Sequence, residues 1–246
     1  MLIKRHQDYV YNVSLRFFLD PDDALDATQE VLIKVITGLK TFRGESLFRT
    51  WLYRIAFNHF LNSPLKKTEK MFERGFDSSA LRAVEAAPEI SDAEIEEVRV
   101  LCLTGMLMCL NREQRLIYIV GEVFEADHNA GAELFEITPA NFRVKLHRAR
   151  ADLLNYVKGK CGLIDQRNSC RCGKKAAVMI QNGFVDKNNL RFNVDYRLKI
   201  SQIVARKSRE FCGETQTKMR ELYQDSPFQS RDEIDRIFAD LTRVQP

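Results

Sequence analysis

Apolar residues recur every three or four positions along most of this 246-residue chain, and this spacing constrains the fold more than any other feature. A helix places such residues on one face, whereas a half-buried strand needs strict alternation. Glycine and proline, which interrupt helices, number only 11 and 6. The sequence therefore predicts an all-α protein. One predicted apolar stripe contains Ala24, Ala27, Val31, Val35 and Leu39.

Capping residues and breaks in the apolar spacing predict the helix boundaries. Asp22 or Asp23 caps the second helix and Ser46 caps the third. Helices are expected over about 6–19, 22–39, 46–61, 92–110, 193–223 and 231–242, with three more between 111 and 157. The chain is thus expected to form two small helical domains joined by a linker, with a helical C-terminal extension. The corresponding ranges are 1–62, a linker over 63–97, 98–158 and 159–246.

The charge of the chain is unevenly distributed, although the net charge is only +4. Residues 111–137 contain 2 basic and 6 acidic residues, whereas residues 138–160 contain 6 basic and 1 acidic. A local change of this kind is typical of an element that binds a polyanion. A solvated helix face is the alternative that charge alone leaves open.

A helix-turn-helix pattern coincides with this change of charge. Asp127 is a good N-cap for a short helix over 129–135, Glu136 and Ile137 form the turn, and Thr138-Pro139 opens the next helix. In that helix the expected buried face contains Phe142, Leu146, Ala149 and Leu153. The opposite, basic side contains Ala140, Asn141, Val144, His147 and Arg148, flanked by Arg143 and Lys145. Such a helix suits the major groove of DNA, where Asn141 and Arg148 could contact base edges, although a plain helical hairpin with a wet basic face has the same pattern.

The stretch FRGESLFRTWLYR at 42–54 mixes aromatic side chains with arginines. It is either a buried helix face with a charged rim or a surface that holds unstacked bases and their phosphates. Phe48, Leu52 and Ile55 fit the core of a helix that begins here. Trp51 is also expected to serve packing, because large aromatic residues in small helical domains usually do.

Two longer segments resemble a known family. DPDDALDATQEVLIKVITGL and the following FRGESLFRTWLYRIAFNHFLN resemble conserved region two of the sigma-70 family, in its extracytoplasmic-function (ECF) type. LNREQRLIYIVGEVFEADHNAGAELFEITPANFRVKLHRARADLL resembles region four of the same family. The resemblance extends over about residues 6–62 and 98–157, in the order found in the family.

The resemblance implies a non-catalytic specificity subunit that binds core RNA polymerase at its clamp helices and flap, recognises the −35 and −10 promoter elements, and captures melted −10 DNA. The residues that it implies for polymerase binding are Asp26, Gln29, Glu30 and Lys34. Those implied for the −10 element are Phe42, Arg43, Gly44, Glu45, Ser46, Arg54 and Asn58. Those implied for the −35 element are Thr138, Ala140, Asn141, Arg143, Val144, Lys145, His147 and Arg148.

Two residues depart from the pattern of region four. Gly131 lies where the family usually has a branched apolar residue, and a glycine inside a helix costs roughly 0.5–1 kcal/mol. Glu136 lies at the turn position usually held by glycine, which adds strain if its φ is positive. Both departures predict a somewhat less stable helix-turn-helix.

The C-terminal extension begins with a cysteine cluster, Cys161, Cys170 and Cys172, near several basic residues. No cofactor is required by the resemblance, but these cysteines, with Cys212 or a histidine, could bind zinc, act as a thiol switch, or be structural. Cys102 and Cys109 are expected in the core.

The remaining expectations concern location and partners. The chain shows no secretory signal and no membrane span, so we expect a protein of the bacterial cytoplasm with reduced cysteines. An anti-sigma factor is an expected partner besides polymerase and promoter DNA. Two other hypotheses stay open: a sigma-like DNA-binding regulator that has lost polymerase docking, and a thiol- or metal-sensing protein controlled by its cysteine tail.

Overall fold

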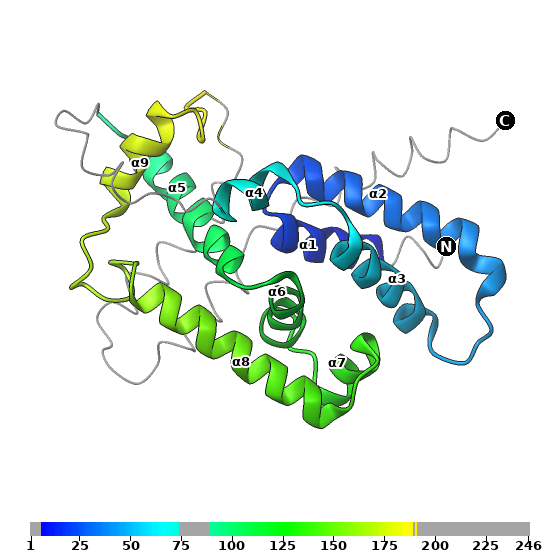
Figure 1. Ribbon diagram of the computed structural model, residues 1–246. Helices are drawn as coiled ribbons and strands as arrows, with labels where there is room; N and C mark the ends of the chain where they lie inside the picture. Colours follow the sequence, from blue (N-terminus) through cyan, green and yellow to red (C-terminus); the bar gives the residue numbers. More distant parts are fainter. Residues whose placement is uncertain (1–5, 74–88, 189, 191–246) are drawn as a thin grey trace, which may run out of the picture. The chain divides into compact units, whose positions relative to one another are not determined.

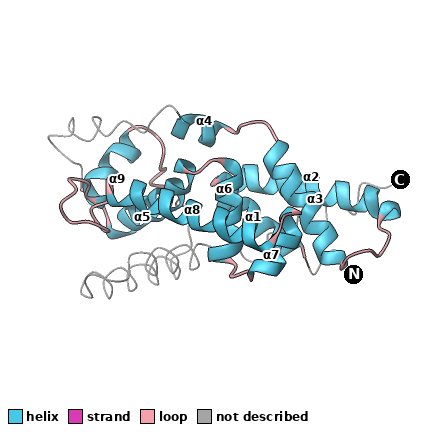
Figure 2. Ribbon diagram, turned by 60° about the horizontal axis from the view of Figure 1, so that its bottom comes forward, coloured by secondary structure: helices cyan, strands magenta, loops and turns pink. Residues whose placement is uncertain are grey.

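The computed structural model describes residues 6–73, 89–188 and 190, and this part of the chain contains helices and loops but no strand (Figures 1 and 2). The all-α prediction is therefore confirmed. The α-helices are α1 (Gln7–Phe18), α2 (Pro21–Gly38), α3 (Phe48–Asn62), α4 (Lys67–Glu73), α5 (Asp92–Gly105), α6 (Arg112–Tyr118), α7 (His128–Phe135), α8 (Pro139–Lys158) and α9 (Cys172–Gln181). Short 3-10 turns at Leu39–Thr41 and Met106–Cys109 and a π turn at Ile119–Val123 extend α2, α5 and α6.

The chain forms two compact units. The described part of the first unit is 6–70 and 111–147, and that of the second is 71–73, 89–110, 148–188 and 190. These structural units do not test the predicted functional domain boundaries at residues 62, 97 and 158, which stay predictions. The closing helices expected at 193–223 and 231–242, together with Cys212, lie outside the described residues.

Helix α1 forms the centre of the first unit and is buried on almost every side. Tyr11 and Leu15 pack against Ala24 of α2, and Phe17 and Phe18 pack against Phe60 of α3. Burying polar side chains costs free energy unless they form hydrogen bonds. A buried Thr28 on α2 accordingly donates to the carbonyl of Ala24 and to Ser14 of α1.

The start of α2 differs from the prediction. The N-cap is Asp20, not Asp22 or Asp23, and its carboxylate accepts hydrogen bonds from the backbone N–H groups of Asp22 (3.0 Å) and Asp23 (3.1 Å). Pro21 explains the difference, because proline fits the first helical position and lacks the N–H that would have no partner there.

The predicted stripe of α2 is correct except at its end. Ala24, Ala27, Val31 and Val35 are buried, but Leu39 is 48% exposed. The α-helix ends at Gly38 and tightens into a 3-10 turn, which changes the direction of the side chain that follows.

The start of α3 was also predicted wrongly. Leu47 is the N-cap, no side chain caps the helix, and the Ser46 hydroxyl instead donates to the Leu47 carbonyl at 3.4 Å. The helix interior is closer to expectation. Leu52 is fully buried, while Phe48 and Ile55 are only partly buried.

The predicted linker contains a helix, α4, that packs into the first unit. Its Glu69 is buried and its carboxylate binds Arg112 and Arg115 of α6. Burial alone would raise the pKa of Glu69, but hydrogen bonds from Arg112, the Lys66 N–H and Arg115 hold this pKa below its usual range. A charge-paired acid can therefore order a segment that is too polar to indicate packing by its apolar residues.

In the second unit α5 packs against α9. The core of this contact contains Val98 of α5 and Ala176 and Met179 of α9. Cys102 lies partly buried beside it, as predicted for a core position. The contact places the start of α9, at Cys172, on α5.

Candidate nucleic-acid and polymerase interface

The exposed side of α2 combines acidic and apolar residues. Asp26, Glu30 and Lys34 are exposed and Gln29 is partly exposed, while Val31 and Val35 face the core. Its last two turns also expose Ile33 (48%) and Ile36 (45%), and the 3-10 turn that follows exposes Leu39 (48%). Adjacent exposed apolar residues with charged neighbours are typical of a protein-binding surface. The sequence analysis missed these three residues, although their spacing of three is visible in the sequence.

The loop after α2 projects charged residues into solvent. Gly44 has φ +73°, a backbone conformation that favours glycine, and no atom lies within 4 Å of the position where its Cβ would be. Arg43, Gly44 and Glu45 are exposed and Ser46 is partly buried. The chain is therefore accessible at this loop, where the resemblance expects DNA.

The aromatic rings of Phe42, Phe48 and Trp51 pack against one another where this loop joins α3. Phe42 packs against Phe48 (ring centroids 5.6 Å apart) and Trp51 (5.3 Å), and Trp51 lies against Gly38 of α2. Trp51 is thus a packing residue, as predicted. Phe42, expected to face DNA, is half-buried in this ring cluster, as are Phe48 and Trp51.

Tyr53 belongs to a different part of the core. Its ring stacks on Tyr9 with centroids 4.2 Å apart, and its hydroxyl lies 3.0 Å from Nδ1 of His6. Burial raises the pKa of Tyr53 to about 12. Phe48, Trp51 and Tyr53 therefore pack within the protein, and the exposed loop contains Arg43, Gly44 and Glu45.

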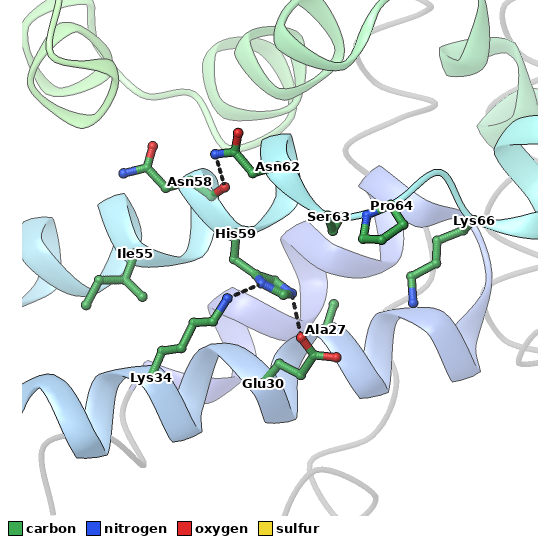
Figure 3. A pocket seen from close by; sticks show the side chains of 10 residues that line it. All are labelled: Ala27, Glu30, Lys34, Ile55, Asn58, His59, Asn62, Ser63, Pro64 and Lys66. Atoms are coloured by element: carbon green, nitrogen blue, oxygen red, sulfur yellow. Dashed lines mark hydrogen bonds and ion pairs between the residues drawn. The ribbon is translucent and has the colours of Figure 1, made fainter.

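A pocket of about 540 Å³ lies between α2 and α3 (Figure 3). It brings Glu30 and Lys34, expected to bind polymerase, next to Asn58, expected to bind DNA. The other lining residues are Ala27, Ile55, His59, Asn62, Ser63, Pro64 and Lys66. One pocket is therefore lined by residues from both predicted sets, while the other residues of the two sets lie outside it.

His59 is held between the two charged residues of this pocket. Its Nδ1 is 2.7 Å from Lys34 Nζ, and its Nε2 is 3.5 Å from a carboxylate oxygen of Glu30. Burial and the charge of Lys34 lower the pKa of His59, and Glu30 opposes them. The imidazole is therefore neutral at pH 7 and accepts the hydrogen bond from the lysine.

Arg54 binds the C-terminal end of α7. Its Nε and Nη2 donate to the Glu133 carbonyl at 3.0 and 2.9 Å, and its Nη1 lies 3.5 Å from the Glu136 carboxylate. The carbonyl groups at a helix C-terminus attract cations. This residue, expected to face −10 DNA, is thus engaged with the helix-turn-helix of the same unit.

Arg112 and Arg115 join α6 to other parts of the first unit, namely α1, α4 and the end of α3, and were missed by the sequence analysis. Arg112 donates to the carbonyls of Phe60, Leu61, Ser63 and Pro64 at the end of α3 and to Glu69. Arg115 donates to the Phe17 carbonyl and to Glu69, each at 3.0 Å. Only the three-dimensional proximity of residues more than 40 positions apart identifies this cluster.

The helix-turn-helix has the predicted local structure. Asp127 caps α7 by accepting from the N–H groups of Asn129 (2.8 Å) and Ala130 (3.0 Å), and these bonds lower the pKa of the Asp127 carboxyl. Glu136 takes φ +54°, so the expected strain at this turn is present. Thr138 caps α8 by accepting from the Asn141 N–H at 3.2 Å.

The two sides of α8 are arranged as predicted. Phe142, Leu146, Ala149 and Leu153 are buried. Thr138, Ala140, Asn141, Arg143, Val144, His147 and Arg148 are exposed. Lys145 is partly exposed and pairs with Glu113 of α6 at 2.8 Å. An exposed basic face over an apolar back is suited to binding in a DNA groove.

Gly131 is required by its neighbour Phe142. A Cβ at this position would lie 2.3–2.6 Å from three ring atoms of Phe142. The glycine therefore makes room for the ring, and the smaller residue in α7 is matched by a larger one in α8. The sequence analysis counted only the helical cost of Gly131 and not the packing of the Phe142 ring that this glycine allows.

None of the helices within the described ranges is long and apolar enough to cross a membrane. The described histidines, cysteines and acids also include no group of three placed to hold a metal ion.

Comparison with known proteins gives consistent matches. The family described as Sigma-70 region 2 matches residues 2–68. The RNA polymerase sigma-H factor of Pseudomonas aeruginosa is 43% identical over 58 residues, which are 24% of this chain and 30% of that protein. The match therefore extends over less than a third of that relative.

Two further relatives match over more of their length. The RNA polymerase sigma factor YlaC of Bacillus subtilis is 27% identical over 153 residues, 62% of this chain and 87% of that protein. The ECF RNA polymerase sigma-E factor of Escherichia coli K12 is 28% identical over 170 residues, 64% of this chain and 85% of that protein. Among solved structures, the sigma factor RpoE in complex with the anti-sigma factor NepR from Bartonella quintana is 19% identical, with a TM-score of 0.42, over 62% of this chain and 91% of that one.

Proposed function

We propose that the chain is an RNA polymerase sigma factor of the sigma-70 family, in its extracytoplasmic-function branch, and that it directs core RNA polymerase to a specific set of promoters. It acts by binding, as a non-catalytic specificity subunit. The observation that carries the proposal is the match of residues 2–68 to region two, in a chain whose α7 and α8 also form a helix-turn-helix with an exposed basic face.

Polymerase docking is assigned to α2. Asp26, Glu30 and Lys34 with the partly exposed Gln29 provide the polar contacts, and the exposed Ile33, Ile36 and Leu39 provide apolar area beside them. Acids near the start of this helix repel DNA phosphates and suit a protein partner with basic residues. Docking here leaves the basic face of α8 available.

Capture of the −10 element is assigned to the 42–46 loop with Asn58. Arginine can pair with phosphate and stack on a base, and an exposed Gly44 lets the backbone approach a nucleotide closely. Phe42 is partly exposed, so an unstacked base could contact the open part of its ring. Arg54 contributes after it leaves the carbonyl of Glu133.

Recognition of the −35 element is assigned to the exposed side of α8. Asn141 and Arg148 are suited to hydrogen bonds with base edges, while Arg143 and Lys145 neutralise phosphates. Val144, His147 and Ala140 complete the contact, and Thr138 lies at the helix N-terminus, which attracts phosphate.

The other features follow from the family. Promoter recognition needs no cofactor, and a zinc ion at Cys161, Cys170 and Cys172 would serve another purpose. The protein would act in the bacterial cytoplasm, where polymerase and DNA are found. An anti-sigma factor that covers α2 or α8 would inhibit it, since those surfaces are exposed.

Reconstitution tests the proposal. The purified chain with bacterial core polymerase should initiate transcription from a narrow set of genomic fragments, and core alone should not. Asn141→Ala with Arg148→Ala should abolish promoter selection but leave core binding intact, whereas Ile33→Ser with Ile36→Ser should abolish core binding. A chain that binds DNA but never core polymerase would instead be a sigma-like regulator and would overturn the proposal.

A further inference from the structure

Five exposed cations lie between the last residue of α8 and the first turn of α9 (Figure 1). They are Lys158, Lys160, Arg167, Arg171 and Lys174. Asp165 is the single acid among residues 158–174, so this segment, which we call the α8–α9 loop, has a net charge of +4. None of these residues is among those assigned to polymerase or to the −35 and −10 elements.

Hydrogen bonds fold the α8–α9 loop into a compact structure. The Asn168 side-chain amide donates to the carbonyls of Lys158 (2.7 Å) and Cys161 (3.1 Å). The carbonyl of Asn168 accepts in turn from Nη1 of Arg171 at 2.5 Å, and the same Nη1 donates to the Cys170 carbonyl at 2.8 Å. One asparagine therefore holds Lys158 and Arg171 together, although they are 13 residues apart in sequence.

The positive charges of the loop are not neutralised from within the described part of the chain. Asp165 pairs with Arg167, with an oxygen-to-nitrogen distance of 2.6 Å. No salt bridge joins Lys158 or Lys174 to an acid of the described ranges. Lys160 contacts an aromatic ring and not an acid, with its Nζ 5.1 Å from the ring centroid. Like charges held in one loop repel one another, and a bound polyanion would relieve this repulsion.

The loop directly continues the helix that is assigned to the −35 element. Helix α8 is unbroken from Pro139 to Lys158, so its 20 residues extend about 30 Å along the helix axis. Lys158 follows Ala140 by 18 residues, which is about five turns, so both residues lie on the same side of α8. One turn of B-DNA is about 34–36 Å long. Phosphates within one DNA turn of the −35 element are therefore within reach of the loop.

We propose that Lys158, Lys160, Arg171 and Lys174 bind the phosphate backbone of the DNA next to the −35 element. The inference rests on the proposed function, which identifies the polyanion as promoter DNA. Lysine binds phosphate as a point charge, and Arg171 keeps its charge while it is bonded to neutral carbonyls. Backbone contacts carry no sequence information. The loop thus adds affinity for DNA of any sequence, while α8 selects the promoter.

The salt dependence of promoter binding tests the loop. Holoenzyme reconstituted from core polymerase and the full-length chain is titrated with a promoter fragment at several salt concentrations. Each phosphate contact releases about 0.9 counterions. Lys158→Gln with Lys174→Gln should therefore lower the slope of log K against log[salt] by about 1.8 and weaken binding about 30-fold at 0.15 M salt. Promoter choice and affinity for core polymerase should not change.

Two controls separate a direct contact from a general effect of charge. Lys67→Gln with Lys70→Gln removes the same charge from exposed positions of α4 and should leave the salt slope unchanged. Neutral methylphosphonates in place of phosphates beside the −35 element should weaken the wild-type holoenzyme. They should not weaken the Lys158→Gln, Lys174→Gln holoenzyme further, because it lacks the charges that pair with those phosphates.

Three results would overturn the inference. These are a Lys158→Gln, Lys174→Gln chain with the wild-type salt slope, one that methylphosphonates weaken as much as the wild type, and one that loses core polymerase, which would assign the loop to an acidic protein surface. A wild-type chain that fails to bind core polymerase would instead overturn the proposed function, so the two failures are distinguishable.

Lysine acetylation of the wild-type holoenzyme keeps the test decisive where a variant folds poorly. Promoter DNA should protect Lys158, Lys160 and Lys174 from the reagent, while Lys70 should be labelled equally with and without DNA. Equal labelling of the three loop lysines with and without DNA would exclude the contact.

Discussion

Replacing Gly131 by alanine tests the packing between α7 and α8 directly. In an ordinary helix interior this change stabilises by up to about 1 kcal/mol, because glycine has the greater conformational freedom to lose. Here the new methyl group would lie 2.3–2.6 Å from the Phe142 ring, whose own exposure is 0%. Overpacking of a buried site costs about 1–3 kcal/mol. The clash exceeds the helical gain, so Gly131→Ala should lower the free energy of unfolding by about 1–2 kcal/mol.

Urea unfolding followed by circular dichroism and by Trp51 fluorescence measures this change, since the single tryptophan lies in the same unit as Gly131. Gly38→Ala is the matched control, because the nearest atom to its Cβ would be 3.7 Å away, an ordinary contact. It should be neutral or stabilising. Adding Phe142→Leu to Gly131→Ala should recover part of the loss. A Gly131→Ala chain as stable as the wild type would refute the reasoning.

Three further changes probe the first unit by the same measurement. Glu69→Ala leaves Arg112 and Arg115 without their buried carboxylate and should cost about 3–5 kcal/mol, whereas exposed Lys70→Ala should stay within about 0.5 kcal/mol. Because the pKa of His59 is lowered in the folded state, the unfolded chain takes up its proton first as pH falls through about 6.5. Stability should therefore decline from pH 7.5 to 5.5, and a slope that His59→Gln leaves unchanged would exclude this cause. Asp20→Ala removes the N-cap of α2 and should cost about 1 kcal/mol, more than Asp22→Ala, whose side chain does not cap the helix; equal losses would contradict the assignment.

Local patterns predicted the elements that depend on neighbouring residues. The cap at Asp127, the turn at Glu136 and the buried face of α8 follow from spacing and capping chemistry, which act within a few positions. Asp20 was missed because Asp22 and Asp23 are equally good caps, and only Pro21 distinguishes among them.

The parts that sequence did not predict depend on contacts between distant residues. Glu69 orders α4 through two arginines more than 40 positions away, so its segment looked like a linker. The sequence predicted that Gly131 weakens the helix-turn-helix, because the contact between Gly131 and the Phe142 ring is visible only in the structure.

Arg54 shows how such a contact bears on the proposed function. Its present partners are one carbonyl oxygen and Glu136, whose side chain is 67% exposed. Because Arg54 is charged, each of its two hydrogen bonds to this carbonyl contributes about 1.5–3 kcal/mol net, and the exposed ion pair contributes at most about 1 kcal/mol. A phosphate can accept two parallel bonds from one guanidinium and also carries the charge that the carbonyl lacks. A phosphate of melted DNA would therefore have to replace both bonds and the ion pair for Arg54 to take part in the proposed −10 capture.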